Sequence, residues 1–278
     1  MSSKILNYFY RLSAGILSLG LTSAFAEDKS QFTLLNPTPR EFMRELSTDR
    51  PDATESPYTV DAGHFQLETS IVDYTRNDQG SGSETYSWMS SNLKIGLLND
   101  LDIQIVFEPF VEDKSVEEDI SGFGNVQIRL KNNLWGNDSG DYAIALMPFV
   151  QFPTGEGELN NNHFEGGLIV PVGISLPNEF SLGLMAEIDF IRNEDNDDYG
   201  SEFVHTATVG HSIIGDLSGF LEYVGTAPRK TGTNYSANFG GGITYAVSED
   251  TQLDLGAYFP LNDNADDLNL FIGFSLRS

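Results

Sequence analysis

Apolar and polar residues alternate along most of the chain from Gly63 to the C-terminus. Between Leu101 and Pro109 the odd-numbered positions are apolar, and the even-numbered ones are polar apart from Val106. The same period of two recurs at 180–191 and at 251–260. Because a strand points successive side chains to opposite faces, this period predicts β-strands with one apolar face and one largely polar face.

Twelve such runs follow one another, and the connections between them alternate in kind. The runs are 63–74, 84–97, 101–112, 122–134, 142–152, 163–176, 180–192, 201–214, 217–226, 233–247, 251–260 and 268–278. Longer polar loops at 75–83, 113–121, 153–162, 193–200, 227–232 and 261–267 interleave with tighter links at 98–100, 135–141, 177–179, 215–216 and 248–250. This order predicts an all-β, antiparallel transmembrane β-barrel of about 12 strands, with long extracellular loops and short periplasmic turns.

Charge is nearly absent from the middle of the apolar phase, which favours a membrane barrel over a secreted β-sandwich or a soluble barrel. An ionised Lys or Arg on a lipid-facing surface costs about 2–4 kcal/mol. The charged residues within the strands fall on the other phase, and we expect them to line the lumen: Glu68, Lys94, Asp102, Glu108, Arg129, Lys131, Glu165, Glu187, Asp189, Glu222 and Asp254. Such side chains either select solutes by size and local field or neutralise one another inside a narrow barrel.

The N-terminus predicts a secreted protein. Lys4 and Arg11 precede the apolar stretch 12–21, and Ala24-Phe25-Ala26 has the small-x-small form that signal peptidase cleaves. We expect a signal peptide over 1–26, cleavage near Ala26 and localisation in the bacterial outer membrane. No later run of 18 apolar residues predicts a spanning helix.

Residues 27–60 contain four prolines and no sustained period. They predict an extended periplasmic N-terminal segment, with a short helical turn around Glu41–Leu46, ahead of a barrel domain over 61–278. A polar cluster near its end has two interpretations: a latch or plug that narrows the pore, or a structural lead-in whose Arg50 pairs locally with Asp49, Asp52 or Glu55. The cluster comprises Asp49, Arg50, Pro51, Asp52, Thr54, Glu55, Ser56 and Pro57.

Composition excludes several classes of function. The chain has 15 Lys+Arg against 41 Asp+Glu, and removing Lys4 and Arg11 with the signal leaves 13 − 41 = −28. This acidity makes nucleic acid a poor partner, because the field repels phosphate. Cysteine is absent, which excludes disulfides, thiolate metal sites and a cysteine nucleophile.

The stretch Ser47–Glu68, STDRPDATESPYTVDAGHFQLE, resembles the opening motif of a bacterial outer-membrane family labelled "putative meta-pathway of phenol degradation" or "transporter". The resemblance extends loosely over 47–278. It implies a segment that leads into the first barrel strand and a porin-like passive channel. The final residues, LNLFIGFSLRS, resemble the last-strand signal that the barrel-assembly machinery reads, although that signal commonly ends on an aromatic residue and this chain ends on Arg277-Ser278.

We therefore expect a passive channel or facilitator for small solutes, including aromatic or hydrophobic ones, with no cofactor, no metal and no enzymatic site. The alternatives are a closed structural or adhesion barrel and a lipid-modifying enzyme built on His205 or His211, which have no serine two residues away. The acidic runs 194–198 and 263–267 either ligate calcium or bridge divalent ions to lipopolysaccharide. The expected partners are outer-membrane lipid, lipopolysaccharide, the barrel-assembly machinery and an unidentified small solute.

Overall fold

A computed structural model describes residues 28–79, 82–116, 118–160, 162–192, 198–228 and 234–278. The expected signal peptide and residues 194–197 of the expected acidic loop lie outside these ranges. Within them, helical structure consists of three single 3₁₀ turns, η1 (Lys29–Gln31), η2 (Arg40–Phe42) and η3 (Gly157–Leu159). No helix in the described ranges is long and apolar enough to cross a membrane.

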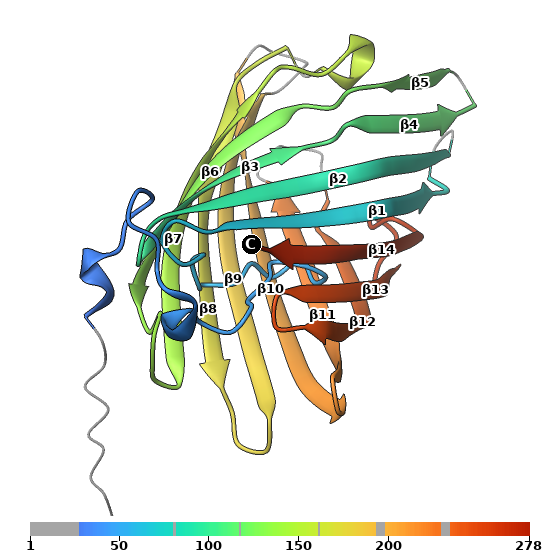
Figure 1. Ribbon diagram of the computed structural model, residues 1–278. Helices are drawn as coiled ribbons and strands as arrows, with labels where there is room; N and C mark the ends of the chain where they lie inside the picture. Colours follow the sequence, from blue (N-terminus) through green and yellow to red (C-terminus); the bar gives the residue numbers. More distant parts are fainter. Residues whose placement is uncertain (1–27, 80–81, 117, 161, 193–197, 229–233) are drawn as a thin grey trace, which may run out of the picture.

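The strands form one antiparallel sheet that closes on itself, because β1 pairs with both β2 and β14 (Figure 1). In chain order they are β1 (Phe65–Asn77), β2 (Ser83–Leu98), β3 (Leu101–Phe107), β4 (Phe110–Ser115), β5 (Asp119–Gly122), β6 (Val126–Trp135), β7 (Tyr142–Phe152), β8 (Glu165–Ser175), β9 (Phe180–Arg192), β10 (Tyr199–Ile214), β11 (Leu217–Pro228), β12 (Ser236–Ser248), β13 (Thr251–Pro260) and β14 (Leu268–Arg277).

Two wall strands are each interrupted once. β3 and β4 both pair with β2, on either side of Glu108-Pro109, and β5 and β6 flank a break at 123–125. Pro109 lacks the backbone N–H that a continuous ladder needs. The fourteen segments therefore make twelve wall strands, which confirms the predicted fold. The predicted loop 113–121 is too long, because Lys114 still pairs with Asp119 and only 116–118 connect the two strands. Because β4 and β5 contain charged residues, the apolar–polar alternation did not reveal their full length.

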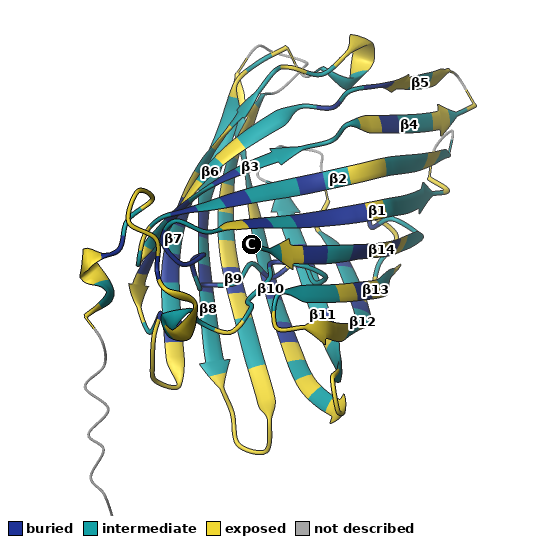
Figure 2. Ribbon diagram, in the orientation of Figure 1, coloured by how far each residue is buried: buried dark blue, intermediate teal, exposed yellow. Residues whose placement is uncertain are grey.

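The two faces of the wall differ as the alternation predicts. Large apolar side chains stand on the outer face, among them Leu184, Ile188, Leu221, Leu255 and Ile272, each 38–59% exposed. On the inner face Lys94, Asp102, Lys131 and Glu222 are almost completely buried. Figure 2 shows buried and exposed positions succeeding one another along the strands.

A β-bulge changes the phase within the first strand. The register with β14 shifts between Ser70 and Val72, so that one extra residue, Ile71, is accommodated. Before the bulge the even positions Glu68 and Ser70 face the interior, and after it the odd position Asp73 does so, where it accepts a hydrogen bond from Asn269. Inward-facing and outward-facing residues therefore alternate strictly before Ile71 and again after it, but not across it.

The N-terminal segment is fastened to the short-turn end of the barrel by a first ion cluster. Lys29 and Arg44 donate to the Asp138 carboxylate at 2.7 and 2.9 Å, and both lie within 4 Å of the buried Asp61. Arg44 also donates to Asn99 in the β2–β3 turn. Burial alone would raise the pKa of Asp138, but the hydrogen bonds from Lys29, Asn99 and Arg44 outweigh it and hold the pKa below the ordinary aspartate value.

A second cluster joins both ends of the chain to the β12–β13 turn. Arg40, in η2, and Arg277, in the last strand, both bind the Asp250 carboxylate. Arg277 also donates to the Arg44 carbonyl at 2.8 Å. η2 begins one residue before the expected turn at 41–46 and is shorter, because the chain becomes extended again at Met43. The two clusters fix where the segment enters the barrel.

A charge placed on the outer face should destabilise the barrel strongly. We expect Leu255→Arg, near the middle of β13, to lower the free energy of unfolding by about 2–4 kcal/mol, since lipid cannot solvate guanidinium. Urea titration in liposomes measures this cost. Val116→Arg, in the β4–β5 turn where Val116 is 83% exposed, is the matched control and should change stability by less than about 0.5 kcal/mol. Equal effects of the two substitutions would contradict the assignment of the outer face.

The Asp138 cluster should make stability depend on pH in a defined direction. Because the folded pKa lies below the unfolded value, the carboxylate stabilises the fold above about pH 3.9, and this contribution is lost as the pH falls through the folded pKa. We expect Asp138→Asn to lose about 1 kcal/mol at pH 7 and nothing relative to wild type at pH 2. Urea titrations at both pH values test this, with Asp141→Asn in the same turn as the control. A pH-independent difference would be the contrary result.

Candidate functional site

Residues 47–60, named the lumen segment, run inside the barrel without regular secondary structure (Figure 1). They contact inward-facing residues of β1, β2, β3, β6, β10, β11 and β13. We expected all of 27–60 to lie in the periplasm, and for the lumen segment this expectation is wrong. The physical reason is that the barrel interior supplies partners for the backbone N–H groups of this segment, which no local pattern in 27–60 reveals.

Asp49 is the most enclosed charge of the lumen segment. Its carboxylate accepts from Lys131 of β6 at 2.7 and 3.0 Å and forms an ion pair with Lys94 of β2. Lys94 also pairs with Glu68 of β1, whose carboxylate accepts the backbone N–H groups of Asp49 and Arg50 at 3.0 Å. Two cations and two anions are thus matched within one buried cluster.

Arg50 reaches the other side of the barrel. Its Nη2 and Nε atoms donate to the two oxygens of Asp254 on β13 at 2.7 and 3.3 Å, and its Nη1 donates to the Ser70 hydroxyl. The guanidinium carbon lies 5.9 Å from the ring centre of Phe271. The lead-in interpretation expected Arg50 to pair with a neighbouring carboxylate, and the structure pairs it with Asp254 instead.

The next residues bind a single carboxylate on β11. Glu222 accepts the backbone N–H groups of Ala53 and Thr54, each at 2.8 Å, and the hydroxyls of Thr54 and Tyr258. The Thr54 hydroxyl also lies 2.5 Å from that of Thr206 on β10. Glu222 is 1% exposed, so these donors replace its hydration.

The extracellular half of the lumen holds most of the remaining expected charges. Glu55 forms an ion pair with Arg129 at 2.5 Å. Glu108 accepts from the Ser87 hydroxyl, and Glu165 from Gln151. Glu187 and Asp189 share the less exposed face of β9, where both interact with Arg129. Near the short-turn end, Asp102 accepts the Val60 N–H at 3.0 Å. All eleven expected lining residues therefore lie on the interior face.

Two cavities lie on opposite sides of the lumen segment. One, of about 350 Å³, lies toward the long loops and is lined by Glu55, Glu108 and Arg129 among others. The other, of about 340 Å³, lies toward the short turns and is lined by Pro51, Asp52 and Ser181 among others. Arg50 lines both. The lumen segment therefore forms the partition between the extracellular and periplasmic halves of the interior.

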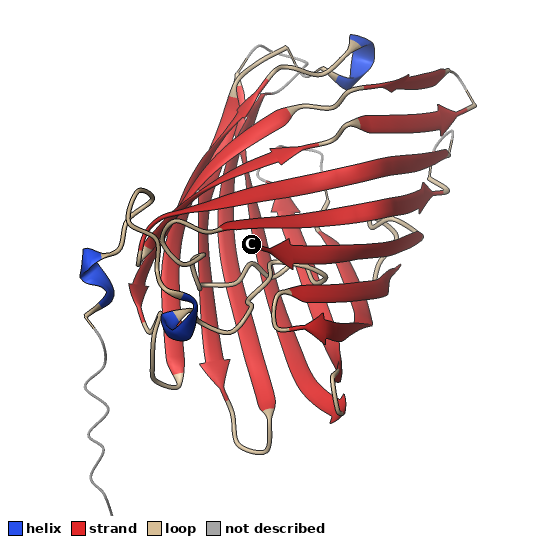
Figure 3. Cartoon of the chain, viewed as in Figure 1, coloured by secondary structure: helices blue, strands red, loops and turns tan. Residues whose placement is uncertain are grey.

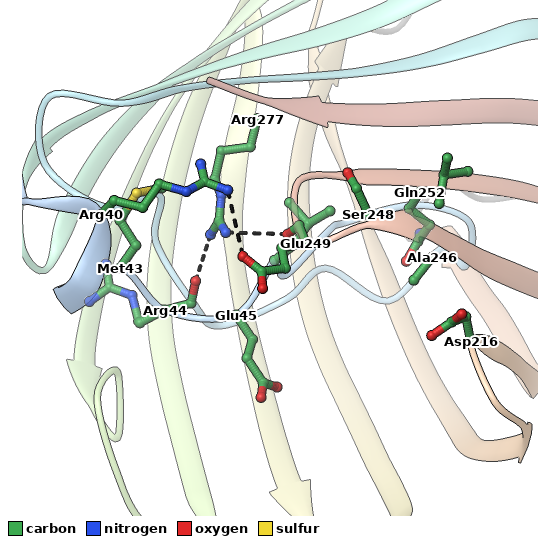
Figure 4. Close-up of a pocket in the computed structure, with 12 residues that line it drawn as sticks. Arg40, Met43, Arg44, Glu45, Asp216, Ala246, Ser248, Glu249, Gln252 and Arg277 are labelled. Carbon is green, nitrogen blue, oxygen red and sulfur yellow. Dashed lines mark hydrogen bonds and ion pairs between the residues drawn. The ribbon is translucent and has the colours of Figure 1, made fainter.

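The periplasmic mouth contains a further cavity of about 600 Å³ between the N-terminal segment and the β12–β13 turn. Figure 4 shows Arg40 and Arg277 directed toward the turn at Glu249, with Arg277 also donating to the Arg44 carbonyl. This cavity precedes the lumen segment on a path from the periplasm.

One part of the inner wall is apolar, which sequence reasoning missed. Met147, Ile169 and Met185 are at most 6% exposed and pack together with Phe149 and Val204 on β7, β8, β9 and β10. The signal was present in the sequence, because Met185 stands on the polar phase of its strand. The inner face of β8 and β9 thus combines an apolar patch with the charged residues Glu165, Glu187 and Asp189.

The histidines lie outside the lumen or at its rim. His205 stacks on Phe203 and lies 3.1 Å from the Tyr235 hydroxyl, and His211 stacks on Phe180. His64 lies between the carbonyls of Thr38 and Ser278. Tyr235 is therefore the hydrogen-bonding partner of His205.

Acidic residues of the loops also have identifiable partners. Asp266 accepts from Asn77, and Asp267 accepts the backbone N–H of Asp78. Among the residues that the structure describes, no group of three or more His, Asp or Glu side chains has the geometry to hold a metal ion.

Comparison with known proteins agrees with this architecture. A crystal structure of an outer membrane channel from Pseudomonas putida F1 superposes with a TM-score of 0.62 over 84% of this chain and 100% of that one, at 13% identity. The NanC porin superposes with a TM-score of 0.53 over 76% of this chain and 98% of that one, at 10% identity. These identities establish the fold alone, and no curated protein matches the sequence. A family profile described as "Putative MetA-pathway of phenol degradation" matches residues 48–278, and the chain therefore belongs to this family of outer-membrane β-barrels.

Proposed function

We propose that the protein is a passive channel or facilitator for small solutes across the outer membrane, with the lumen segment as its plug. The observation that carries this proposal is the pair of polar cavities on the two sides of the lumen segment. A filled structural barrel has no need of an interior that is hollow at both ends. Displacement of a few residues of the lumen segment would join the two cavities.

The similar proteins support this proposal. One superposing structure is titled an outer membrane channel and another a porin, and the family description names phenol degradation. Small solutes, aromatic ones among them, fit an interior that offers an apolar wall at Met147 and Met185 opposite hydrogen-bonding groups. Secretion through a signal peptide cleaved near Ala26, assembly by the barrel-assembly machinery, and contact with outer-membrane lipid and lipopolysaccharide belong to the same proposal.

The plug makes the resting channel a poor conductor. Breaking a buried ion pair by removing one partner costs about 3–5 kcal/mol, since the other charge stays desolvated. Asp49, Arg50 and Glu55 each form such a contact with the wall. Opening therefore requires that these contacts be exchanged for others.

A closed structural or adhesion barrel is the second candidate, and the density of contacts around the lumen segment favours it. In that case the plug would be permanent and the acidic loops would carry the function. The two candidates differ in one property, which is whether the lumen segment moves.

A lipid-modifying enzyme is the least supported candidate, and we propose that the protein has no such activity. A hydrolase of this kind needs a serine within reach of its histidine. His205 lies against Tyr223 and Tyr235 on the outer wall, and His211 lies against Phe180 and the Glu179 carbonyl.

Removing the plug's charges should open the channel. We expect the combined variant Asp49→Asn/Arg50→Gln/Glu55→Gln to raise single-channel conductance in planar bilayers at least several-fold, because its lumen segment no longer forms ion pairs with the wall. The matched control Glu41→Gln/Glu45→Gln changes exposed residues of the same N-terminal region and should conduct as wild type does. Conductance at lipid background in the combined variant, with the fold intact by circular dichroism, would reject the channel.

A reversible lock separates the two leading candidates. The Thr54 and Thr206 hydroxyl oxygens lie 2.5 Å apart, and the chain contains no cysteine, so Thr54→Cys/Thr206→Cys introduces a single disulfide between plug and wall. We expect the oxidised variant to reduce solute-driven liposome swelling at least several-fold relative to wild type, and reductant to restore it. Thr54→Cys alone is the control. Equal swelling rates before and after reduction would show that plug movement is not needed.

A further inference from the structure

The contacts of Arg50 with the wall form a complete site around a guanidinium group. The Asp254 side chain, which is 0% exposed, accepts hydrogen bonds from Nε and Nη2 on one edge of the Arg50 guanidinium. The Ser70 hydroxyl accepts a third hydrogen bond, from Nη1. The Phe271 ring lies alongside at 5.9 Å. A planar cation held by two parallel hydrogen bonds to a carboxylate, with an aromatic ring near it, is the arrangement that proteins use to recognise guanidinium.

Glycines in the neighbouring strands leave the space that this group occupies. A Cβ atom at Gly273 would overlap the Nη2 and Cζ atoms of Arg50 as well as the Thr69 carbonyl oxygen, and one at Gly256 would overlap the Phe271 ring. Both residues stand on the inner face of the wall. The wall therefore forms a recess fitted to a flat cation, in which Arg50 is an insert supplied by the plug.

The wall carboxylates Glu68 and Asp254 differ in the partners that they keep when the plug moves. Glu68 keeps its ion pair with Lys94 and its hydrogen bond from Gln66. Within the described part of the chain, every hydrogen bond and ion pair of the Asp254 side chain goes to Arg50. Opening would thus leave Asp254 buried and unpaired, which is costly unless another cation takes the place of Arg50.

We propose that the recess formed by Asp254, Ser70 and Phe271 is a binding site for the guanidinium group of a cationic solute, and that Arg50 occupies it as a tethered substitute while the channel is closed. This inference deepens the proposed channel function and rests on it. A solute that carries this group exchanges directly with Arg50, so that binding of the solute and movement of the plug are linked.

The recess distinguishes guanidinium from ammonium. The two oxygens of Asp254 lie side by side and match the two parallel N–H groups of a guanidinium. A compact ammonium does not present two parallel donors and therefore fits this pair of oxygens less well. Glu222, on β11 two strands away from β13, adds a second buried carboxylate to this part of the wall, so that an anionic solute is repelled.

The test removes the Arg50 side chain and supplies a guanidinium group in solution. In Arg50→Gly, methylguanidinium at about 10 mM should raise the melting temperature in detergent by several degrees and in a saturable manner, because a ligand that binds only the folded state stabilises it. Methylammonium at the same ionic strength should give less than a third of this shift. Arg50→Ala serves in the same way if the glycine variant does not fold.

One further variant decides the result. Arg50→Gly/Asp254→Asn keeps the empty recess without its charge and should show no shift with methylguanidinium. An equal shift in this variant, or an equal shift with methylammonium, would overturn the proposal. So would the absence of any shift in both Arg50→Gly and Arg50→Ala.

The melting assay does not depend on conductance, so the two proposals can fail separately. A saturable, Asp254-dependent shift in a protein that never conducts would reject the channel and retain the recess. Conductance in the charge-depleted variant without any guanidinium-specific shift would retain the channel and reject the recess.

Discussion

The interior of this barrel depends on the neutralisation of buried charge. Lys94 and Lys131 are at most 2% exposed, and each finds its anion in Asp49, a residue that belongs to no strand. Without the lumen segment, two desolvated ammonium groups would share only the carboxylates of their own wall. The plug and the wall are therefore one electrostatic unit, and the inner surface is complete only with both.

The strands of the wall could be predicted from the sequence because apolar and polar residues alternate along them. Alternation locates the strands, and the lengths of the connections distinguish the two ends, so that twelve strands could be counted before any coordinates were known. The exceptions have local causes: the bulge at Ile71 shifts the phase, and the charged hairpin after Pro109 resembles a loop. Neither changes the topology.

The site could be predicted only as a set of residues. The polar cluster 49–57 and the inward charges were visible, yet the contact of Arg50 with Asp254 joins positions 204 residues apart. The carboxylates of Asp49, Asp52 and Glu55 lie within five residues of Arg50 in the sequence, and local pairing was the simpler expectation. Only the curvature of the closed sheet, which brings β13 to face the N-terminal segment, decides among them.

The place of the plug at the start of the chain has a consequence for assembly. The plug leaves the ribosome before any strand, whereas its partners Glu222 and Asp254 belong to β11 and β13, near the end. The contacts of the plug therefore cannot be complete until the last strands are in place, and a chain that loses its C-terminal strands loses the partners that hold its N-terminus.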